Sequence, residues 1–441
     1  MEKVYDLIIV GGGITGSAIF YALSKYTNVK DVLLLEKYSD LSTLNSGPAS
    51  NSQTLHFGDV ETNYTYEKSK SVKKAAEYIL NYTKTIENSN KKIIQKCQKM
   101  VLGVGEEEIE TLDSIYNSNI KELFPGLQNI SKKELSRIEP NIVLGRDKKE
   151  KVAALLSNCG YMVNFSELSK SFISKSKMDK NKKIKFNTKV YRIIRDNAEN
   201  YIIIANNGVY KARFVVFCAG IYSLYFAKML GYDKNISILP VGGGYYYSKR
   251  MLNGKVYRVQ HGHIPFAAVH ADPDITNSKI TRYGPTVILG PEIEKGHIST
   301  MLDDFKVFDL DLDSLKSLKN IFMDKDINRI IRNNASYTIP IIGKMRFLKN
   351  EVQKIIPKMK YSDLWTVNAS GGIRPQIIDE KKKSLILGEA KLKEENLIFN
   401  ITPSPGASSC LGSALEDISY ISNNLGLEFR SDLWEMQLGK M

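Results

Sequence analysis

Residues 6–36 have the sequence DLIIVGGGITGSAIFYALSKYTNVKDVLLLE, and this stretch decides the fold of the first part of the chain. Asp6 to Val10 form an apolar run that is typical of a buried strand. The apolar residues from Ile14 to Tyr26 recur with helical spacing, and a second apolar run follows at Val32 to Leu35. A strand, a helix and a strand in this order predict a βαβ unit with a parallel sheet.

The turn between the first strand and the helix holds glycines with the spacing G-x-G-x-x-G. Gly11 permits the tight turn, Gly13 lets a pyrophosphate approach the backbone, and Gly16 lets the helix pack against the strand. The N-terminus of the helix offers free amides to an anion, and Glu36, at the end of the second strand, is placed to accept hydrogen bonds from a ribose. These features predict a dinucleotide site; the alternative is a glycine-rich turn that binds nothing.

Two later glycine clusters do not make a second site of this kind. Gly103-Val104-Gly105 is followed by three glutamates, which would repel a pyrophosphate, and Gly242-Gly243-Gly244 is followed by three tyrosines that continue a strand. A chain of 441 residues with one nucleotide site, and with strands that return to the same sheet late in the sequence, is expected to hold FAD permanently.

The formal net charge of +14 is compatible with nucleic acid, an anionic membrane or small acidic molecules as partners. The sequence has no zinc-binding spacing and no RNA-recognition signature, so we expect neither a nucleic-acid partner nor a metal site. No apolar run approaches the roughly 20 residues that span a bilayer. We expect no cleavable signal, because residues 7–10 lead directly into the glycine turn, and four widely spaced cysteines suit reduced thiols in the cytosol.

The rest of the chain predicts an α/β protein with two domains. Residues 63–139 are helical and charged with one strand near Met100 to Val104, and residues 238–290 contain short strands typical of an antiparallel sheet. Strands are also expected at 184–186, 190–194, 201–204, 214–218 and 397–401, the last followed by a helix through Asn423. We therefore predict a Rossmann-like FAD-binding domain of the glutathione-reductase type over 1–62, 150–232 and 366–430, an α+β substrate domain over 63–149 and 233–365, and a tail over 431–441.

Nearly the whole chain resembles malate:quinone oxidoreductases, within the D-amino-acid-oxidase-like FAD superfamily, and more distantly L-2-hydroxyglutarate dehydrogenase. The segments that carry the resemblance are LLLEKYSDLSTLNS (33–46), NSQTLHFGDVETNYT (51–65), LPVGGGYYY (239–247), GKVYRVQHGHIPFAAVHADPD (254–274), TRYGPT (281–286), GGIRPQIID (371–379) and NITPSPGASSC (400–410). The resemblance implies oxidation of (S)-malate, or of L-lactate in part of the bacterial branch, with a membrane quinone as acceptor. A soluble FAD-dependent amine or amino-acid oxidase that uses oxygen stays open as an alternative, because the same superfamily contains both.

Oxidation of a 2-hydroxy acid requires a base for the hydroxyl proton. His270 ends an apolar strand just before a polar turn, so it is the predicted base, and the resemblance implies the same. His56 is the second candidate because its segment follows the ribose-binding strand and is expected to pass beside the flavin. A histidine packed only for structural reasons is the alternative for each.

Cations are required for the substrate carboxylates, and arginine suits them because its planar fork binds a carboxylate through two hydrogen bonds. Arg374 and Arg282 are both framed by rigid residues, and Arg374 is the expected partner of the carboxylate beside the reacting carbon. Arg282 is the predicted partner of the second carboxylate, with Gln53 and His56 as alternatives, and Arg258 is a weaker candidate. A surface salt bridge is the alternative role of each arginine.

Two further segments are assigned to the cofactor and the membrane. The turn from Thr402 to Ala407 is expected to direct amides at the flavin, and Trp434, Leu438 and Met441 form a stripe that would either enter a membrane surface or pack on the protein. A quinone reductase without a spanning helix is expected to lie peripherally on the cytoplasmic face of the plasma membrane. Besides the glycine turn and Glu36, the expected FAD contacts are Ile14, Thr15, Lys37, Ser52, Gln53, Thr54, Val190, Ala219, Gly220, Pro405, Gly406 and Ala407.

Overall fold

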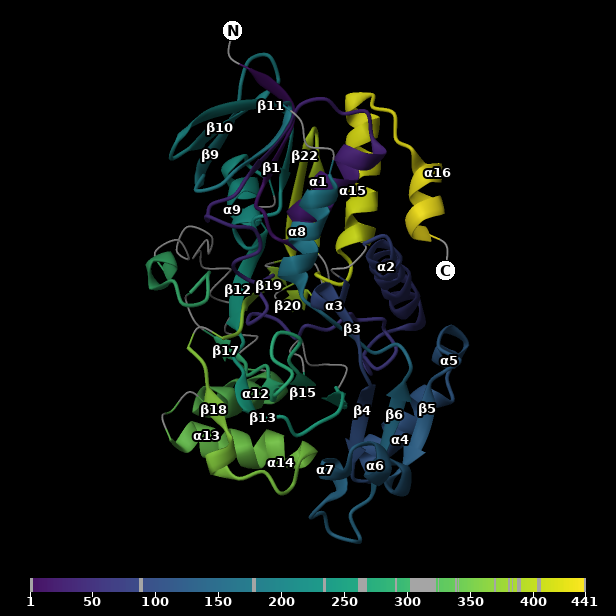
Figure 1. Cartoon of the computed structure of the whole chain (residues 1–441). Coiled ribbons are helices and arrows are strands. Elements are labelled where there is room, and N and C mark those ends of the chain that lie inside the picture. The colour runs from purple at the N-terminus through teal and green to yellow at the C-terminus, as the bar shows by residue number, and fades with distance from the viewer. Residues whose placement is uncertain are drawn as a thin grey trace.

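Figure 1 shows the computed structural model of the chain, with one unit built around β1, β11 and α1 above a second unit that contains β4, β13 and α13. The structure describes residues 3–86, 90–176, 180–232, 235–260, 268–289, 292–301, 323, 325–337, 339, 341–368, 370–379, 381–382, 384–386, 390–402 and 406–439.

The first unit is built on a mostly parallel sheet. Its central strands run in the order β22-β11-β1-β2-β8, and every pair in this run is parallel. The hairpin of β9 and β10 extends the sheet beside β11, and β21 pairs antiparallel with β22. The strands are β1 (Val4–Val10), β2 (Val32–Leu35), β8 (Lys182–Lys185), β9 (Val190–Arg195), β10 (Tyr201–Ala205), β11 (Gly208–Phe217), β21 (Ala390–Glu394) and β22 (Leu397–Thr402).

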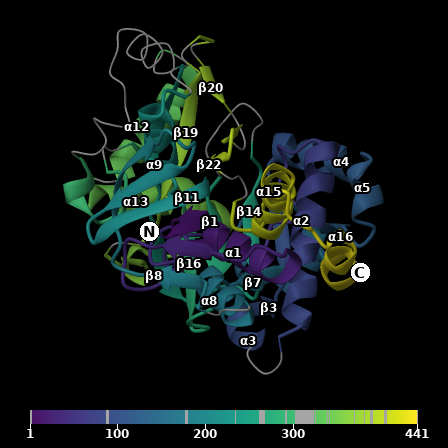
Figure 2. The same ribbon diagram turned by 90° about the horizontal axis from the view of Figure 1, so that it is seen from above.

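Helices cover both faces of this sheet, because successive residues of its buried strands point to opposite sides. Leu7 and Ile9 belong to the core beneath α1, whereas Ile8 and Val10 belong to the core on the face of α9. Helix α1 contacts both α8 and α15, and the view from above shows all three on one side (Figure 2). The predicted Rossmann-like fold is therefore confirmed. The helices are α1 (Ile14–Tyr26), α8 (Phe165–Lys175), α9 (Tyr222–Met229) and α15 (Cys410–Leu425).

The second unit contains a mixed sheet in the order β18-β13-β16-β15-β14-β4-β6-β5. All its neighbours are antiparallel except β14 and β4, which run parallel. The strands are β4 (Lys99–Val104), β5 (Gln128–Ser131), β6 (Val152–Ser157), β13 (Tyr246–Lys249), β14 (Lys255–Arg258), β15 (His270–Pro273), β16 (Ile280–Gly284) and β18 (Trp365–Thr366).

Two details of the second sheet differ from the prediction. Strand β6 pairs with β4 and β5, although the sequence placed residues from 150 onward in the FAD-binding domain. The segment 63–139 contains β3 (Ile94–Lys96) and β5 in addition to the one expected strand. Short apolar strands do not indicate which sheet they join, because tertiary contacts decide their pairing. The division into two domains at the other predicted boundaries stays a prediction.

A smaller sheet, in the order β17-β12-β19-β20, lies between the two units in Figure 1. Its strands are β12 (Ile236–Gly242), β17 (Ile288–Leu289), β19 (Ile373–Asp379) and β20 (Ser384–Ile386), and β3 pairs separately with β7 (Tyr161–Val163). The remaining helical segments are α2 (Tyr66–Lys84), α3 (Asn90–Ile93), α4 (Glu106–Tyr116), α5 (Ile120–Leu123), α6 (Lys132–Ile138), α7 (Pro140–Val143), η1 (Ile298–Thr300), α12 (Lys325–Tyr337), α13 (Ile342–Phe347), η2 (Leu348–Val352), α14 (Gln353–Ile355), η3 (Tyr361–Asp363), α16 (Ser431–Trp434) and η4 (Glu435–Gly439).

The C-terminal tail packs on the first unit. Trp434 is fully buried, with its ring centroid 4.9 Å from that of Tyr26 and 5.7 Å from that of Tyr78, and Leu438 is also buried. Met441 lies outside the described residues. Of the two roles considered for the apolar stripe, packing on the protein is the one found for Trp434 and Leu438. None of the helices in the described part of the chain has both the length and the apolar content needed to cross a membrane.

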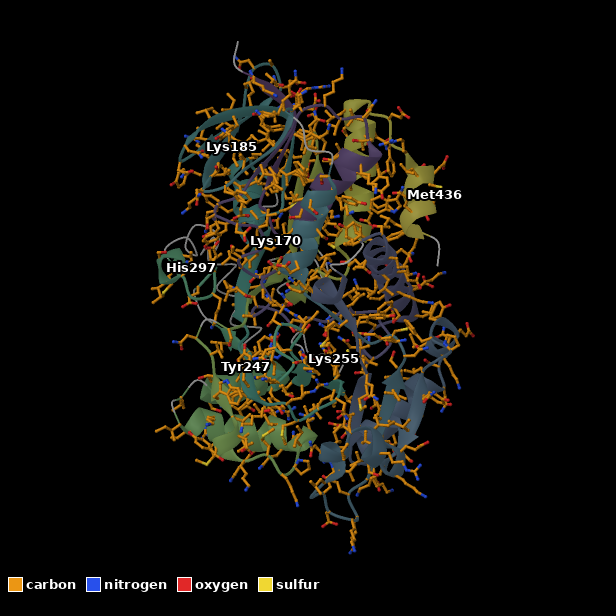
Figure 3. All side chains as sticks on the ribbon, viewed as in Figure 1. Lys170, Lys185, Tyr247, Lys255, His297 and Met436 are labelled. Atoms are coloured by element: carbon orange, nitrogen blue, oxygen red, sulfur yellow. The ribbon has the colours of Figure 1, made fainter. Side chains whose placement is uncertain are left out.

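Replacing Trp434 with alanine should destabilise the protein by about 3 to 5 kcal/mol, because it removes a large buried side chain and leaves a cavity. The matched control is Met436→Ala in the same tail, since Met436 is 59% exposed and labelled at the surface in Figure 3. We expect that control to change stability by less than about 0.5 kcal/mol. Thermal and denaturant unfolding measure both variants; equal effects would contradict the packed tail.

Candidate active site

A cavity of about 830 Å³ lies where the first unit meets the second and the small sheet. Its volume is within the range of ligand sites, and its walls combine the glycine turn after β1 with residues of β12, β14, β15 and β19. The residues singled out from the sequence that line it are Gly11, Gly13, Ile14, Thr15, Glu36, Lys37, Ser52, Thr54, His56, Val190, Ala219, Gly220, Arg258, His270, Arg374, Gly406 and Ala407. Gly16, Gln53 and Arg282 lie outside this lining, and Pro405 lies outside the described residues.

The three motif glycines have different surroundings. Gly11 has a φ of +106°, and a Cβ added to it would lie 2.4 Å from the carbonyl oxygen of Cys218. A Cβ on Gly16 would lie 2.0 Å from the carbonyl oxygen of Gly11, so this contact between helix and strand requires glycine. At Gly13 the nearest atom would be the hydroxyl of Ser46 at 3.4 Å, so the protein itself leaves room there. Gly11 and Gly16 are thus needed by the fold, whereas the open space at Gly13 is available to a ligand.

The wall beside the turn suits the ADP half of a dinucleotide. Helix α1 begins after Gly13 and has no acidic residue in its first turn, so its positive end favours an anion, although the hydroxyl of Ser46 accepts from the amide of Ile14 at 3.1 Å. The buried carboxylate of Glu36 accepts hydrogen bonds from the backbone amides of Gly12 at 2.6 Å and Tyr38 at 2.8 Å, which fixes its position at the cavity. Burial raises the pKa of Glu36, partly offset by these amides. Each carboxylate oxygen keeps a lone pair for a ribose hydroxyl.

Lys37 is placed at the cavity, but its ammonium is occupied. It donates to both carboxylate oxygens of Glu294, at 2.7 and 2.6 Å, and Tyr38 donates to the same group at 2.7 Å. The predicted cofactor contact of Lys37 is therefore not supported for its charged group.

His270 is the first of two histidines at the cavity with a carboxylate partner. It is 3% exposed on β15, and its Nδ1 lies 2.5 Å from Oδ2 of Asp272. The fully buried Lys255 donates from Nζ to Oδ1 of Asp272 at 3.0 Å, and the ring of Tyr257 stacks on the imidazole with centroids 4.7 Å apart. Burial lowers the pKa of His270, and Asp272 opposes this shift. Burial alone would raise the pKa of Asp272, but His270 and Lys255 lower it, so Asp272 stays ionised.

His56 is the second histidine at the cavity that has a carboxylate partner. Its Nδ1 lies 2.6 Å from Oε1 of Glu61, and its ring centroid lies 6.3 Å from that of Tyr257. Burial acts to raise the pKa of Glu61, but His56 and the buried Lys99 lower it to about 2. Both histidines contribute to the same cavity on either side of Tyr257, so the structure retains both as candidate bases.

Arg374 reaches the cavity from β19, next to Ile373. Its side chain is exposed, and no hydrogen bond or ion pair to another described residue is recorded for it. Arg258 also lines the cavity, but its guanidinium contacts Glu351 at 2.9 Å and Glu108 at 3.1 Å. A substrate carboxylate would therefore meet a guanidinium without a carboxylate partner at Arg374 but not at Arg258.

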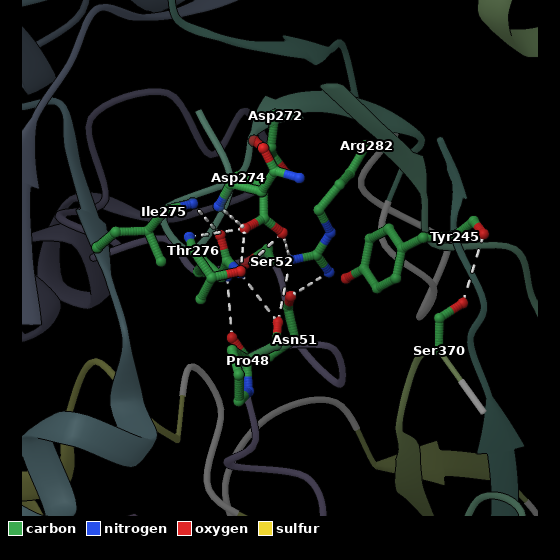
Figure 4. Close-up of polar contacts among 12 residues, drawn as sticks. Pro48, Asn51, Ser52, Tyr245, Asp272, Asp274, Ile275, Thr276, Arg282 and Ser370 are labelled. Carbon is green, nitrogen blue, oxygen red and sulfur yellow. Dashed lines mark hydrogen bonds and ion pairs between the residues drawn. The ribbon is translucent and has the colours of Figure 1, made fainter. Parts of the chain in front are cut away.

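The structure contradicts the predicted substrate contact of Arg282. Its side chain is 1% exposed, and its guanidinium donates to the carbonyl oxygens of Pro48 at 3.0 Å and Asn51 at 2.7 Å while stacking on Tyr245 (Figure 4). Strand β16 lies between β13 and β15, so this arginine points into the protein and holds the loop of residues 48–51. The rigid residues around it indicated burial and not a substrate site.

Gln53 belongs to the same buried cluster. Its amide nitrogen donates to the carbonyl oxygen of Pro48 at 3.0 Å and to Asp274 at 3.1 Å, and its amide oxygen accepts from the backbone of Ile275 at 2.8 Å. These contacts turn the side chain of Gln53 into the protein, and Gln53 is not part of the cavity lining, so its predicted roles at substrate and cofactor gain no support from the structure.

Sequence reasoning missed the residues behind the histidines. The spacing of His270 and Asp272 places them two residues apart, on the same face of a strand, which could have indicated the pair. Lys255 and Lys99 are partners on the parallel strands β14 and β4, and nothing in their local sequence indicates complete burial.

Comparisons with known proteins show the family to which the chain belongs. The family model described as malate:quinone oxidoreductase (Mqo) matches residues 3–441. The chain is 39% identical to the probable malate:quinone oxidoreductase of Campylobacter jejuni, over 99% of both chains, and 39% identical to the malate:quinone oxidoreductase of Helicobacter pylori, over 97% of this chain and 96% of that one. The fold matches that of the FAD-bound L-alpha-glycerophosphate oxidase of Mycoplasma pneumoniae, with a TM-score of 0.64, 21% identity and 95% of each chain covered. The chain therefore belongs to the malate:quinone oxidoreductase family.

Proposed function

We propose that the protein oxidises (S)-malate to oxaloacetate with bound FAD and passes the electrons to a membrane quinone. The observation that carries the proposal is His270, which shares a cavity with the glycine turn and has the buried Asp272 and Lys255 behind it. Membership of the family and the activities named for the relatives in C. jejuni and H. pylori support the choice of substrate and acceptor.

The cofactor lies along the first unit in this proposal. Gly11, Gly13 and the first turn of α1 hold its pyrophosphate, and Glu36 holds its ribose. FAD, when bound, takes up the hydride from the reacting carbon of the substrate. The predicted contacts of Ser52, Thr54, Val190, Ala219, Gly220, Gly406 and Ala407 are supported by their places in the cavity lining.

The protein's own residues manage the proton and the carboxylate. Because Nδ1 of His270 lies against Asp272, its proton belongs on that side, and Nε2 is left to accept the substrate's hydroxyl proton. Arg374 binds the carboxylate next to the hydroxyl carbon through two hydrogen bonds. Asp272 and Lys255 do not touch the substrate; they fix the tautomer and the charge of the imidazole.

L-Lactate is the second candidate substrate, and one observation favours it. Malate carries two carboxylates, yet Arg282 is buried away from the cavity and Arg258 is paired with two glutamates. A site with Arg374 as its main free guanidinium suits a monoanion, whereas the close relatives are named for malate.

The quinone electron acceptor determines where in the cell the protein is expected to act. Quinones dissolve in the bilayer, so a quinone reductase must reach the membrane surface, and the net charge of +14 favours anionic headgroups. In this proposal the protein is peripheral and lies on the cytoplasmic face of the plasma membrane.

Under nitrogen, (S)-malate should bleach the bound flavin, and quinone analogues should restore its colour much faster than oxygen or NAD. Arg374→Ala should lower kcat/KM roughly ten- to a hundredfold for malate and lactate alike, because it removes a charge-assisted contact worth about 1.5 to 3 kcal/mol. Arg282→Ala should instead lower the melting temperature, because Arg282 holds the loop of residues 48–51.

A wild-type preference for lactate in kcat/KM would move the assignment to the second candidate. Peroxide formed from amino acids under air, with no bleaching by hydroxy acids, would replace both with an amine or amino-acid oxidase. A selective loss of malate turnover in a well-folded Arg282→Ala variant would restore Arg282 to the substrate site.

Gly13→Ala should give well-folded protein that binds FAD about ten- to a hundredfold more weakly, because the new methyl group occupies the space assigned to the pyrophosphate. Gly16→Ala is the comparison: its methyl group would meet the carbonyl oxygen of Gly11, so it should destabilise the fold itself by about 1 to 3 kcal/mol. Fluorescence titration of the apoprotein with FAD and thermal unfolding separate the two effects. Unchanged FAD affinity in Gly13→Ala would remove Gly13 from the proposed site.

The pH dependence of kcat/KM should identify the base. His270 must be neutral to accept a proton, so activity falls as the pH drops through its pKa, which burial places below about 6.5. Lys255→Met removes a nearby positive charge, which raises the pKa of His270 and moves the acid limb to higher pH. Asp272→Asn removes a negative charge and should move the acid limb to lower pH.

Lys99→Met is the matched control, because Lys99 is equally buried and pairs with Asp59 behind His56. It should leave the acid limb nearly unchanged if His270 is the base. If Lys99→Met shifts the acid limb of the kcat/KM profile and Lys255→Met does not, the base would be His56 and not His270.

A further inference from the structure

One region of the surface is unusually apolar. Seven of the fifteen large hydrophobic side chains that are exposed among the described residues fall between positions 339 and 367. Scattered exposed hydrophobics need no explanation, but a cluster marks an interaction site. We call the region the α13–β18 face and define it by Ile341, Ile342, Met345, Tyr361, Trp365 and Val367.

Packing joins the elements of this face. Phe347, on the inner side of α13, stacks on Tyr246 with ring centroids 4.6 Å apart, and Tyr246 pairs with Thr366 of β18. Lys344 of α13 lies 3.9 Å above the ring of Tyr361 in η3. Figure 1 accordingly shows α13 and β18 next to each other at the lower left. The exposed residues of α13, η3 and β18 therefore belong to one region.

Ile341 is the residue least suited to water. Its side chain is 71% exposed, and its backbone, with φ +64° and ψ −58°, lies outside the regions that β-branched residues ordinarily adopt. A strained backbone that presents an isoleucine to solvent is unfavourable for the isolated protein. Contact with an apolar partner would compensate for both features.

The surroundings of the face are basic. Residues 339–367 contain five lysines and one arginine against one glutamate and one aspartate, which gives a net charge of +4. Arg346, Lys349, Lys354, Lys358 and Lys360 are exposed. Tryptophan and tyrosine combined with isoleucine, methionine and basic residues are the composition of surfaces that enter the headgroup region of anionic membranes.

We propose that the α13–β18 face is the surface by which the protein rests on an anionic lipid bilayer. The inference deepens the proposed function, since it rests on a bilayer-dissolved acceptor. The chain runs from Val367 of this face to Gly372 and Arg374, which line the cavity, so the face is connected to the reaction site by a short segment. The buried tail does not serve this purpose: Figures 1 and 2 both place α16 on the opposite side of the molecule from α13.

The test measures binding of the purified holoprotein to vesicles of phosphatidylglycerol and of phosphatidylcholine by co-sedimentation. Ile341→Asn and Trp365→Thr should each lower partitioning onto phosphatidylglycerol about tenfold, because each removes an apolar side chain from the headgroup region. Because Ile341 is 71% exposed, Ile341→Asn should change the melting temperature little, so unfolding does not explain its loss of binding. Arg346→Gln should weaken binding to phosphatidylglycerol about fivefold and leave binding to phosphatidylcholine unchanged.

Met436→Asn is the matched control, because Met436 is 59% exposed and lies on the tail, away from the α13–β18 face (Figure 3). It should bind like the wild type, and all variants should be bleached by the hydroxy acid at the wild-type rate in solution. Loss of binding in Met436→Asn, with normal binding in Ile341→Asn and Trp365→Thr, would overturn the proposal in favour of the tail.

Two other outcomes would also overturn it. One is that the wild-type protein does not bind phosphatidylglycerol vesicles at low salt. The other is a dimer that Ile341→Asn separates into monomers without changing vesicle binding, which would make the face a contact between two copies. Flavin bleaching reports on the proposed function separately: an enzyme that no hydroxy acid reduces, yet that docks through this face, would refute the function and leave the docking surface intact.

Discussion

The close contact between Gly16 and the backbone of Gly11 is the constraint on which the rest of the structure depends. A single methyl group at position 16 would lie 2.0 Å from the carbonyl oxygen of Gly11, so the helix can approach the strand this closely only where residue 16 lacks a side chain. That approach brings the positive end of α1 to the carboxyl end of β1, and the parallel pairing of β1 with β2 brings Glu36 to the same edge. The proposed pyrophosphate and ribose contacts depend on the positions of the α1 N-terminus, the end of β1 and Glu36. Strands β14 and β15 of the second unit form the wall of the cavity that faces this edge.

The second unit contains two ion pairs that are buried in the interior of the protein. Lys99 and Lys255 are completely buried on neighbouring strands, each against a carboxylate, at Asp59 and Asp272. Burying an ion pair costs several kcal/mol per ion before the attraction between partners offsets it, and apolar residues of similar size are often more stabilising. Fold stability is therefore a poor explanation for two such pairs. The position of Lys255 and Asp272 behind His270 explains that pair better, because an ionised carboxylate orients an imidazole only if another cation keeps the carboxylate ionised. Behind His56, Lys99 acts on the carboxylate of Glu61, whose pKa it lowers.

The sequence was informative where the chemistry is local. The glycine spacing, the apolar strands and Glu36 lie within 31 residues, and their roles follow from backbone sterics and hydrogen bonding, so the Rossmann-like unit could be predicted almost element by element. Arg282 shows where such reasoning ends. Its rigid neighbours suggested a fixed substrate contact, but its direction depends on strands β13 and β15 and on a loop more than 200 residues earlier in the chain. Lys255 and Gln53 have the same dependence on distant partners. The direction of a polar side chain in a sheet is a tertiary property, whereas a glycine's role in a turn is a local one.

The two histidines must also be considered together. His56 and His270 flank Tyr257 in one cavity, and a positive charge on His56 lowers the pKa of His270 beyond the effect of burial. Lys255 acts in the same direction, because its positive charge also lowers the pKa of His270, whereas Asp272 raises it. The neutral form of an imidazole is the one that can accept a hydroxyl proton, so a lowered pKa suits His270 to its proposed role as the base. The electrostatics around His270 thus depend on the pairing of β14 with β15, the neighbouring strands that carry Lys255 and Asp272.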